Sequence, residues 1–212
     1  MQNTPFAKLT VRPLIVAAVL ACALLLPAQA QMTQQGPKLV GTGAVGGAGQ
    51  NSVAVSADGN TALVGGFLDD TNAGAVWVWT RSGGSWTQQG PKLVGTGAVG
   101  QPYQGYSVAV SADGNTALVG GFKDNLGVGA VWVWTRSGAS WTQQGSKLVG
   151  TGAVGNANQG ISVALSGDGN TALVGGLLDD TNAGAVWVWT RDTGGVWTQQ
   201  GPNLIGDRKS VV

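Results

Sequence analysis

The sequence predicts an all-β fold built of β-propeller blades. Three observations predict it: an internal repeat, short alternating strands and tight turns between them. The segment SVAVSADGNTALVGG stands at 52–66 and again at 107–121, and SVALSGDGNTALVGG follows at 162–176. The step from Asp58 to Asp113 is 55 residues. A repeat of this length indicates one supersecondary unit that stacks on copies of itself.

Each unit is predicted to form four antiparallel strands. In the first unit these strands cover 52–56, 61–66, 75–81 and 86–95. Asp58-Gly59, between two apolar runs, predicts a hairpin turn, and the glycines after Ser82 predict a second one. In the third strand Val76 and Val78 should face one side of the sheet, and Trp77 and Trp79 the other. Gly90-Pro91 indicates a bulge or an edge position in the fourth strand.

Four-stranded units at this spacing are typical of propeller blades, because stacking buries faces that a lone sheet would expose. The predicted blades are 51–95, 106–150 and 161–206. Residues 31–50 precede them as an orphan outer strand, over 32–41, and a linker. Such a strand could close a ring, and three blades suggest part of a larger ring. A β-solenoid is the main alternative.

Residues 1–30 are predicted to be a secretory signal peptide. Lys8 and Arg12 form a basic segment, 14–26 is apolar, and 28–30 reads Ala-Gln-Ala, a small-residue cleavage site. The apolar run is too short for a comfortable membrane span. We expect cleavage after this tripeptide, no membrane span in the mature chain, and a secreted, cell-surface or periplasmic protein. A lipoprotein with Cys22 as the lipidated residue is the alternative.

The repeat breaks at residues 207–212. The TQQG unit at 198–201 continues like the others as far as Gly206, and DRKSVV then replaces TGAVG. One reverse translation of these residues matches a common sequencing adapter with an in-frame stop. We interpret them as adapter-derived and expect the gene to run on past Gly206. A genuine basic tail is the alternative.

The composition excludes several function classes. Charged residues are 10% of the chain, and basic side chains beyond the signal peptide are scattered singly, so nucleic acid is not an expected partner. The chain has no histidine, and its only cysteine is Cys22. The predicted mature chain therefore has no histidine to act as a general base and no cysteine to act as a nucleophile. The pairs Asp69-Asp70 and Asp179-Asp180 are expected to be solvated, and we predict that the protein is not an enzyme.

Segments of each unit resemble the FG-GAP repeat, the blade of integrin-α-type propellers. In the first unit these segments are QNSV (50–53), VGGF (64–67) and GAVWVW (74–79). The resemblance covers residues 32–206. It implies a propeller that acts as a binding or adhesion module at a cell surface.

The FG-GAP family often carries a calcium loop between the first two strands. Here that loop is only SADGN, which offers Asp58 and Asn60. Calcium takes about six to eight oxygen ligands, so this turn is too short to supply them. We interpret Asp58, Asp113 and Asp168 as turn residues, and expect neither calcium nor another cofactor.

Ligand binding is expected on loops. The loop after the second strand (67–74 in the first unit) and the inter-blade loop (96–105) adjoin the same strand ends, so they should open on one face. The candidate ligand-binding residues on these loops are Asp69, Asp70, Asn72, Asp124, Asn125, Asp179, Asp180, Asn182, Tyr103 and Tyr106.

The nine tryptophans are expected to pack between blades, with Trp77, Trp132 and Trp187 largely buried. Exposed tryptophans near a blade edge would instead indicate sugar stacking. The sequence thus favours an exported, non-catalytic binding or adhesion module with a protein or glycan ligand. The alternatives are a carbohydrate-binding propeller and an accessory domain of a larger secreted enzyme or surface protein.

Overall fold

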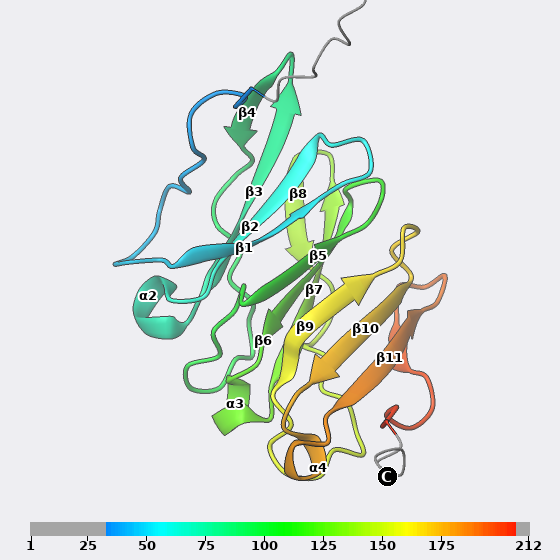
Figure 1. Ribbon diagram of the computed structural model, residues 1–212. Coiled ribbons are helices and arrows are strands. Elements are labelled where there is room, and N and C mark those ends of the chain that lie inside the picture. Colours follow the sequence, from blue (N-terminus) through cyan, green and yellow to red (C-terminus); the bar gives the residue numbers. More distant parts are fainter. Residues whose placement is uncertain (1–32, 207–212) are drawn as a thin grey trace, which may run out of the picture. The chain divides into compact units, whose positions relative to one another are not determined.

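The computed structural model describes residues 33–206, whose strands form three separate four-stranded sheets (Figure 1). In each sheet the strands follow in chain order, and all neighbours are antiparallel. All three sheets belong to one compact unit, which starts at Gln35. The predicted signal peptide (1–30) and the predicted adapter-derived residues (207–212) lie outside the described residues.

The three sheets are named blades 1, 2 and 3. Blade 1 contains β1 (Gln50–Val55), β2 (Thr61–Gly66), β3 (Ala75–Ser82) and β4 (Ser85–Gln88). Blade 2 contains β5 (Ser107–Val110), β6 (Thr116–Gly121), β7 (Ala130–Ser137) and β8 (Ser140–Gln143). Blade 3 contains β9 (Gln159–Leu165), β10 (Thr171–Gly176), β11 (Ala185–Arg191) and β12 (Trp197–Gln199). Each sheet falls on one predicted repeat, but β1 and β9 begin slightly earlier than predicted and the last strands end earlier, at Gln88, Gln143 and Gln199.

The arrangement of the sheets is that of propeller blades. The first strands, β1, β5 and β9, lie side by side, and each sheet extends outward from them (Figure 1). Within residues 33–206, parallel pairing between units is limited to the isolated bridges Gly74–Gln104 and Gly129–Gln159. A β-solenoid would instead pair successive units in parallel along whole strands, so this alternative does not fit. The predicted fold class is confirmed.

The third strands explain how the blades stack. Val76 and Val78 lie on one side of β3 and Trp77 and Trp79 on the other, as predicted, because successive side chains of a strand alternate. The valine face of blade 1 packs against the tryptophan face of blade 2, which carries Trp132 and Trp134. The same contact recurs between blades 2 and 3, through Val131, Val133, Trp187 and Trp189. Each interface thus buries the valine face of one blade against the tryptophan face of the next.

The outer strand of each blade is shorter than predicted. The fourth strand was expected over 86–95, but β4 ends at Gln88. Gly90 has a φ of +71°, which lifts the chain out of the sheet, and Pro91 has no N–H to donate. The chain rejoins β3 at Leu93, whose N–H donates to the Val76 carbonyl (2.7 Å). The outer strand is interrupted at Gly90-Pro91, so the continuous strand predicted over 86–95 is wrong.

The orphan strand predicted over 32–41 is not formed, because residues 33–49 contain no strand. Its counterpart in blade 1 pairs with β3, but within residues 33–206 no third strand precedes this segment. Leu39 and Ala48 pack instead against Trp77 and Trp79. The segment therefore covers the tryptophan face of blade 1.

The predicted polar loop after each second strand contains a tight turn. These turns are α2 (Asp69–Asn72), α3 (Asp124–Gly127) and α4 (Asp179–Asn182). They are not regular helices, because two central residues of each, such as Asp70 and Thr71, have positive φ. Within residues 33–206, no helix has the length and apolar character needed to cross a membrane.

Replacing Trp132 by alanine is expected to lower the free energy of unfolding by about 3–5 kcal/mol. Trp132 is fully buried between blades 1 and 2, and its Nε1 donates to the Thr96 carbonyl (2.8 Å). Urea unfolding followed by circular dichroism would measure the loss. Trp141→Ala is the control and should lose clearly less, because Trp141 is only half-buried. Equal losses would contradict the assigned role of the tryptophan face.

Candidate functional site

The loops expected to carry the site lie together, as predicted. The N–H of Tyr103 donates to the Asn72 carbonyl (3.0 Å), and that of Gln104 donates to the Ala73 carbonyl (3.1 Å). The loop after β2 and the linker before β5 thus meet at the junction of blades 1 and 2. The same contacts recur at the next junction, where the N–H of Asn158 donates to the Gly127 carbonyl. This end of the blades is called the loop end.

Three of the candidate ligand residues are structural. Asp69, Asp124 and Asp179 are at most 1% exposed, so the expectation that the aspartate pairs are solvated is wrong for Asp69 and Asp179. One carboxylate oxygen of each accepts from a linker N–H: Val45, Val99 and Val154 respectively. The second oxygen binds Lys92, Lys147 and Asn203. These aspartates tie each turn to the linker, so none is available to a ligand.

The other polar candidates remain accessible. Asp70, Asn125, Asp180 and Asn182 are exposed, and Asn72 is half-buried. All have positive φ, which asparagine and aspartate tolerate better than most residues. The positive φ of the turn is enough to explain why asparagine or aspartate stands at these positions. That they contact a ligand stays a prediction.

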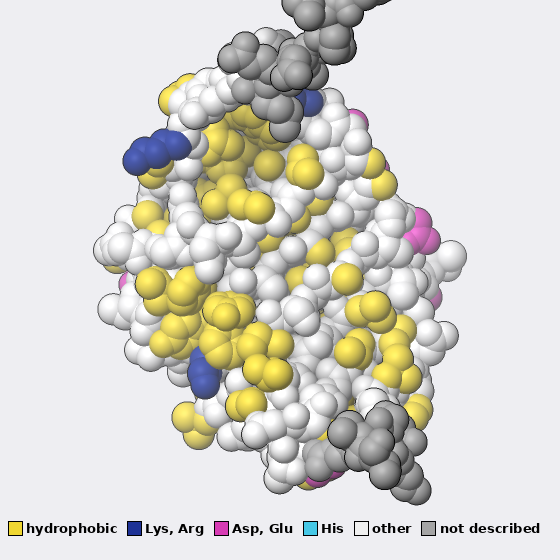
Figure 2. All heavy atoms as spheres, viewed as in Figure 1, with side chains coloured by type: hydrophobic (Ala, Val, Ile, Leu, Met, Phe, Trp, Pro, Cys, Tyr) yellow, Lys and Arg dark blue, Asp and Glu magenta, His cyan; other side chains and the backbone are white. Residues whose placement is uncertain are grey.

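Four aromatic rings pack together at the loop end, and we call Phe67, Tyr103, Tyr106 and Phe122 the aromatic cluster. Phe67 stacks on Tyr103 with centroids 5.9 Å apart and meets the edge of Tyr106 at 5.4 Å. Phe122 lies 5.7 Å from Tyr103 and 4.4 Å from Tyr106. All four are half-buried, so each keeps some exposed surface. Figure 2 shows hydrophobic side chains gathered where Figure 1 draws the start of β5.

Tyr103 occupies a strained backbone position. Its φ is +58°, and the corresponding residues of the other linkers are Gly49 (+60°) and Asn158 (+57°). Glycine and asparagine suit this region, whereas a bulky residue there costs about 1–2 kcal/mol. The chain therefore places a tyrosine ring in the cluster at a cost in backbone strain, which points toward function.

The aromatic cluster departs from the repeat. At the junction of blades 2 and 3, Asn158, Ile161 and Leu177 stand where the first junction has Tyr103, Tyr106 and Phe122. Lys123 adds a charge, with its Nζ 5.3 Å from the Phe122 ring centroid. The sequence identified both tyrosines but missed Phe67 and Phe122. The signal for them was the Gly-Gly-Phe that ends two of the three second strands.

The tryptophans act in packing. Trp77, Trp132 and Trp187 are fully buried, as predicted, and their Nε1 atoms donate to the carbonyls of Thr42, Thr96 and Thr151. Trp86, Trp141 and Trp197 are half-buried, and each lies under an arginine guanidinium at 5.4–5.6 Å. The tryptophans therefore do not support sugar stacking.

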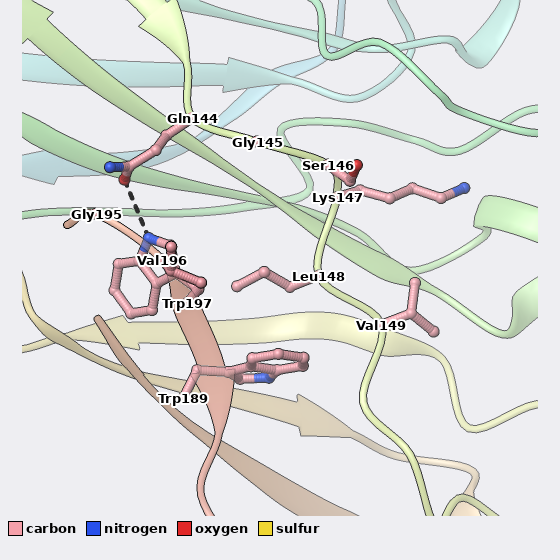
Figure 3. Close-up of a pocket in the computed structure, with 10 residues that line it drawn as sticks. All are labelled: Gln144, Gly145, Ser146, Lys147, Leu148, Val149, Trp189, Gly195, Val196 and Trp197. Atoms are coloured by element: carbon pink, nitrogen blue, oxygen red, sulfur yellow. Dashed lines mark hydrogen bonds between the residues drawn. The ribbon is translucent and has the colours of Figure 1, made fainter. Parts of the chain in front are cut away.

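A cavity of about 400 Å³ lies between blades 2 and 3, away from the loop end (Figure 3). Trp189, Trp197 and Leu148 line it, and Trp197 Nε1 donates to the Gln144 side chain (3.1 Å). The Lys147 side chain extends away from Trp189 (Figure 3) and ends at Asp124. A smaller cavity of about 260 Å³ occupies the corresponding place between blades 1 and 2. The cavity thus follows from the stacking of the blades.

The Asp-Gly turns hold their aspartates in hydrogen bonds, as expected of turn residues. Asp58 Oδ1 accepts from the Ser56 hydroxyl (2.5 Å) and from the Asn60 N–H (2.9 Å). These bonds lower the pKa of Asp58 below its ordinary value of 3.8, with that from Ser56 the largest cause. The pKa of Asp168 is lowered in the same way, mainly by Ser166. Burial raises the pKa of Asp113, but bonds from Ser111 and Asn115 outweigh it and the pKa is lowered.

No protein-family model matches the chain, and no curated protein is similar to it in sequence. Its fold is similar to the crystal structure of Saccharomyces cerevisiae Sqt1, with a TM-score of 0.48 and 16% sequence identity. The match covers 72% of this chain and 35% of that chain, so the chain spans about a third of Sqt1. The FG-GAP resemblance stays a prediction.

Stability is expected to fall as the pH drops from neutral through about 4. The folded-state pKa of Asp58, Asp113 and Asp168 is lowered, so the unfolded chain takes up protons first. The stabilisation is present above the unfolded pKa and lost as the pH falls through the folded pKa. Urea midpoints at pH 7 and pH 3 would measure the loss.

The matched variant replaces the serines of the three turns, Ser56, Ser111 and Ser166, by alanine. Without their hydroxyls the aspartate pKa values should return toward normal, and the difference between pH 7 and pH 3 should shrink. An unchanged difference would assign the acid sensitivity to other carboxylates.

Proposed function

We propose that this chain is an exported, non-catalytic binding module, built of FG-GAP-like propeller blades, that recognises a protein or glycan through its loop end. The aromatic cluster is the observation that carries the proposal. It is a partly exposed group of rings on a scaffold whose other large aromatics are used in packing. The cluster also lies where two loop sets converge, and binding residues favour loops held by a rigid scaffold.

The composition of the cluster supports recognition of a ligand. Tyrosine provides a large apolar surface with a polar tip and is enriched at interfaces. Within the described residues, neither Tyr103 nor Tyr106 uses its hydroxyl in a hydrogen bond. Lys123, whose Nζ lies 5.3 Å from the Phe122 ring centroid, and Asn125, on the same loop as Phe122, are exposed and could bind polar groups of a ligand. We assign the contact surface to the four rings with these two side chains.

The proposed absence of catalysis rests on the chemistry of the side chains. The chain has no histidine, and the buried aspartates are committed to turn and linker contacts. Within residues 33–206, no three acidic, histidine or cysteine side chains gather in one group. A binding role at the cell surface agrees with the FG-GAP resemblance and with the proposed signal peptide.

Carbohydrate binding is a second candidate, because sugars commonly stack on exposed aromatic rings. The cluster offers such rings, and the loops after β2 and β6 also carry exposed amide and carboxylate groups, notably Asn125 and Asp70. In this form the hypothesis rests on Tyr103 and Tyr106 instead of the tryptophans. An accessory role within a larger secreted enzyme or surface protein would use the same surface.

Tyr103→Asn is expected to weaken ligand binding at least tenfold while preserving the fold. Asparagine holds the same backbone conformation at residue 158, so the variant removes the ring without adding strain. Binding would be measured on a glycan array and against purified extracellular-matrix proteins. A signal on the array alone would select the carbohydrate form of the hypothesis.

Thr193→Asn is the control for this experiment, because Thr193 is exposed in the turn between β11 and β12 and is neither in the aromatic cluster nor among the candidate ligand residues. It should bind like the wild type. A ligand that binds Tyr103→Asn and Phe122→Leu as tightly as wild type would place the binding surface elsewhere.

Export predicts a defined N-terminus. Expressed with residues 1–30 in a bacterial host, the protein should appear outside the cytoplasm and begin at Gln31, because cleavage is expected after Ala30. Mass spectrometry of the exported protein would identify the first residue. Replacing Ala28 and Ala30 by lysine should block cleavage, and a full-length cytoplasmic product from the wild type would contradict export.

A further inference from the structure

The cavity between blades 2 and 3 is larger than the stacking of blades requires. Its volume is about 400 Å³, whereas the cavity at the corresponding place between blades 1 and 2 has about 260 Å³. Pockets that bind small molecules have volumes of about 300–1,000 Å³. Of these two cavities, only the one between blades 2 and 3 falls in that range. It lies inside the stack, between two complete blades.

The sequence departs from the repeat at this cavity. Residue 146 is serine, whereas the corresponding positions hold proline: Pro37, Pro91 and Pro202. The turn between β11 and β12 is one residue longer than its counterparts, because the step from Trp86 to Trp141 is 55 residues and that from Trp141 to Trp197 is 56. Both changes border the same cavity, although the repeats are otherwise nearly identical. This convergence points to a role beyond the packing of blades.

The longer turn holds an apolar side chain at the cavity. Val196, at the position of Ser140 in blade 2, lines the cavity and is 60% exposed. Asp192 fixes this residue, because its carboxylate accepts from the Val196 N–H (2.8 Å) and the Asp192 N–H donates to the Val196 carbonyl (3.0 Å). An exposed valine in a well-bonded turn is available to cover an apolar ligand.

Ser146 supplies polar groups that a proline would not. It lines the cavity and is exposed. Within residues 33–206, neither its N–H nor its hydroxyl forms a hydrogen bond, whereas proline has no N–H at all. Two donors are therefore available to an acceptor atom of a ligand. Lys147 is not available, because its ammonium group binds Asp124.

The inner wall of the cavity is apolar and aromatic. Leu148 and Trp189 are each 9% exposed, and Trp197 is half-buried. Figure 3 shows the two indole rings and the Leu148 side chain around one space. Aromatic rings favour offset-stacked or edge-to-face contacts with other rings, and an apolar cavity of about 150 Å³ can hold benzene. The larger volume of this cavity therefore has room for a bicyclic ring system.

We infer that this cavity binds a small planar aromatic molecule that carries a hydrogen-bond acceptor, such as a carboxylate or a carbonyl oxygen. The rings of the ligand pack against Trp189, Trp197 and Leu148, Val196 covers them, and the acceptor faces Ser146. A sugar fits less well, because its many hydroxyl groups would meet apolar walls. The site lies away from the loop end, so it does not rest on the proposed function.

Calorimetric titration of the full chain with 2-naphthoate tests the site. This probe has a bicyclic aromatic body and one carboxylate. We expect one site per chain, with half-saturation at or below about 1 mM. Cyclohexanecarboxylate keeps the carboxylate but is not aromatic, so it should bind several-fold more weakly. No saturable binding of 2-naphthoate up to about 10 mM, or equal binding of the two probes, would overturn the inference.

Two variants restore the residues of the other repeats. Ser146→Pro removes both donors, and Val196→Ser removes the apolar cover, so each should weaken binding about fivefold. Each introduces a residue that the fold already carries at a corresponding position, so the circular dichroism and the urea midpoint should match the wild type. Wild-type affinity in both variants would overturn the inference.

Tyr103→Asn is the control, because Tyr103 belongs to the aromatic cluster at the loop end, where an aromatic probe could also bind. This variant should bind 2-naphthoate like the wild type. A loss of affinity confined to Tyr103→Asn would place the probe at the aromatic cluster and contradict a site in the cavity.

The junction of blades 1 and 2 allows the site to be built a second time. Pro91→Ser, combined with replacement of residues 137–140 (SGAS) by DTGGV, gives the smaller cavity the features of the larger one. Calorimetry should then find two sites per chain instead of one. A folded variant that still has one site would show that these features do not create the binding site, and the inference would fail.

Discussion

The stack of blades depends on the contact between a tryptophan of each third strand and a glycine of the preceding linker. Gly95 lies so close to Trp132 that an added Cβ would stand 2.2 Å from the indole, and Gly41 and Gly150 are equally close to Trp77 and Trp187. The indole N–H donates to the next carbonyl of the same linker. A large ring is thereby fixed in position and orientation, and both valines beside it meet the neighbouring sheet. Most buried polar groups in proteins have such a partner, and for Trp77, Trp132 and Trp187 the linker supplies it.

The buried aspartates complete the same design at the loop end. Asp124 binds a linker N–H with one oxygen and Lys147 with the other, so turn, linker and outer segment are held by one side chain. The rigid part of the loop end is therefore repeated in every blade. The residues that differ between repeats stand on these turns and linkers, and the residues of the aromatic cluster are among them. Separation of a constant scaffold from variable surface residues is typical of binding proteins.

The sequence was sufficient for the strands, the alternation along β3 and the turns, because these depend on local pattern and were repeated three times. It did not predict how long the gap in the outer strand is. Gly90-Pro91 indicates an irregularity, but nothing in the local pattern shows that the chain rejoins the sheet at Leu93. The burial of Asp69 was also missed, because adjacent aspartates in a polar loop resemble a solvated turn. Its partners Val45 and Lys92 are distant in sequence. Only two of the four rings of the aromatic cluster were predicted. Both tyrosines were identified because they stand in a linker that varies between repeats. Phe67 and Phe122 were missed because they directly follow strands that barely vary.

The near-identity of the blades has a consequence for folding kinetics. Residues 52–66 and 107–121 are the same sequence, so β6 could pair with β3 of the wrong blade as favourably as β2 does. Equilibrium stability cannot choose between pairings of equal energy, and such repeats are prone to misassembly between units. The rate of pairing can choose between them, because strands joined by a short turn meet faster than strands of different blades. The turn at Gly83-Gly84, where both residues have positive φ, matches strand twist and closes the β3–β4 hairpin locally. The Asp58-Gly59 turn does the same for β1 and β2, so each blade can assemble from its own strands before a distant copy competes.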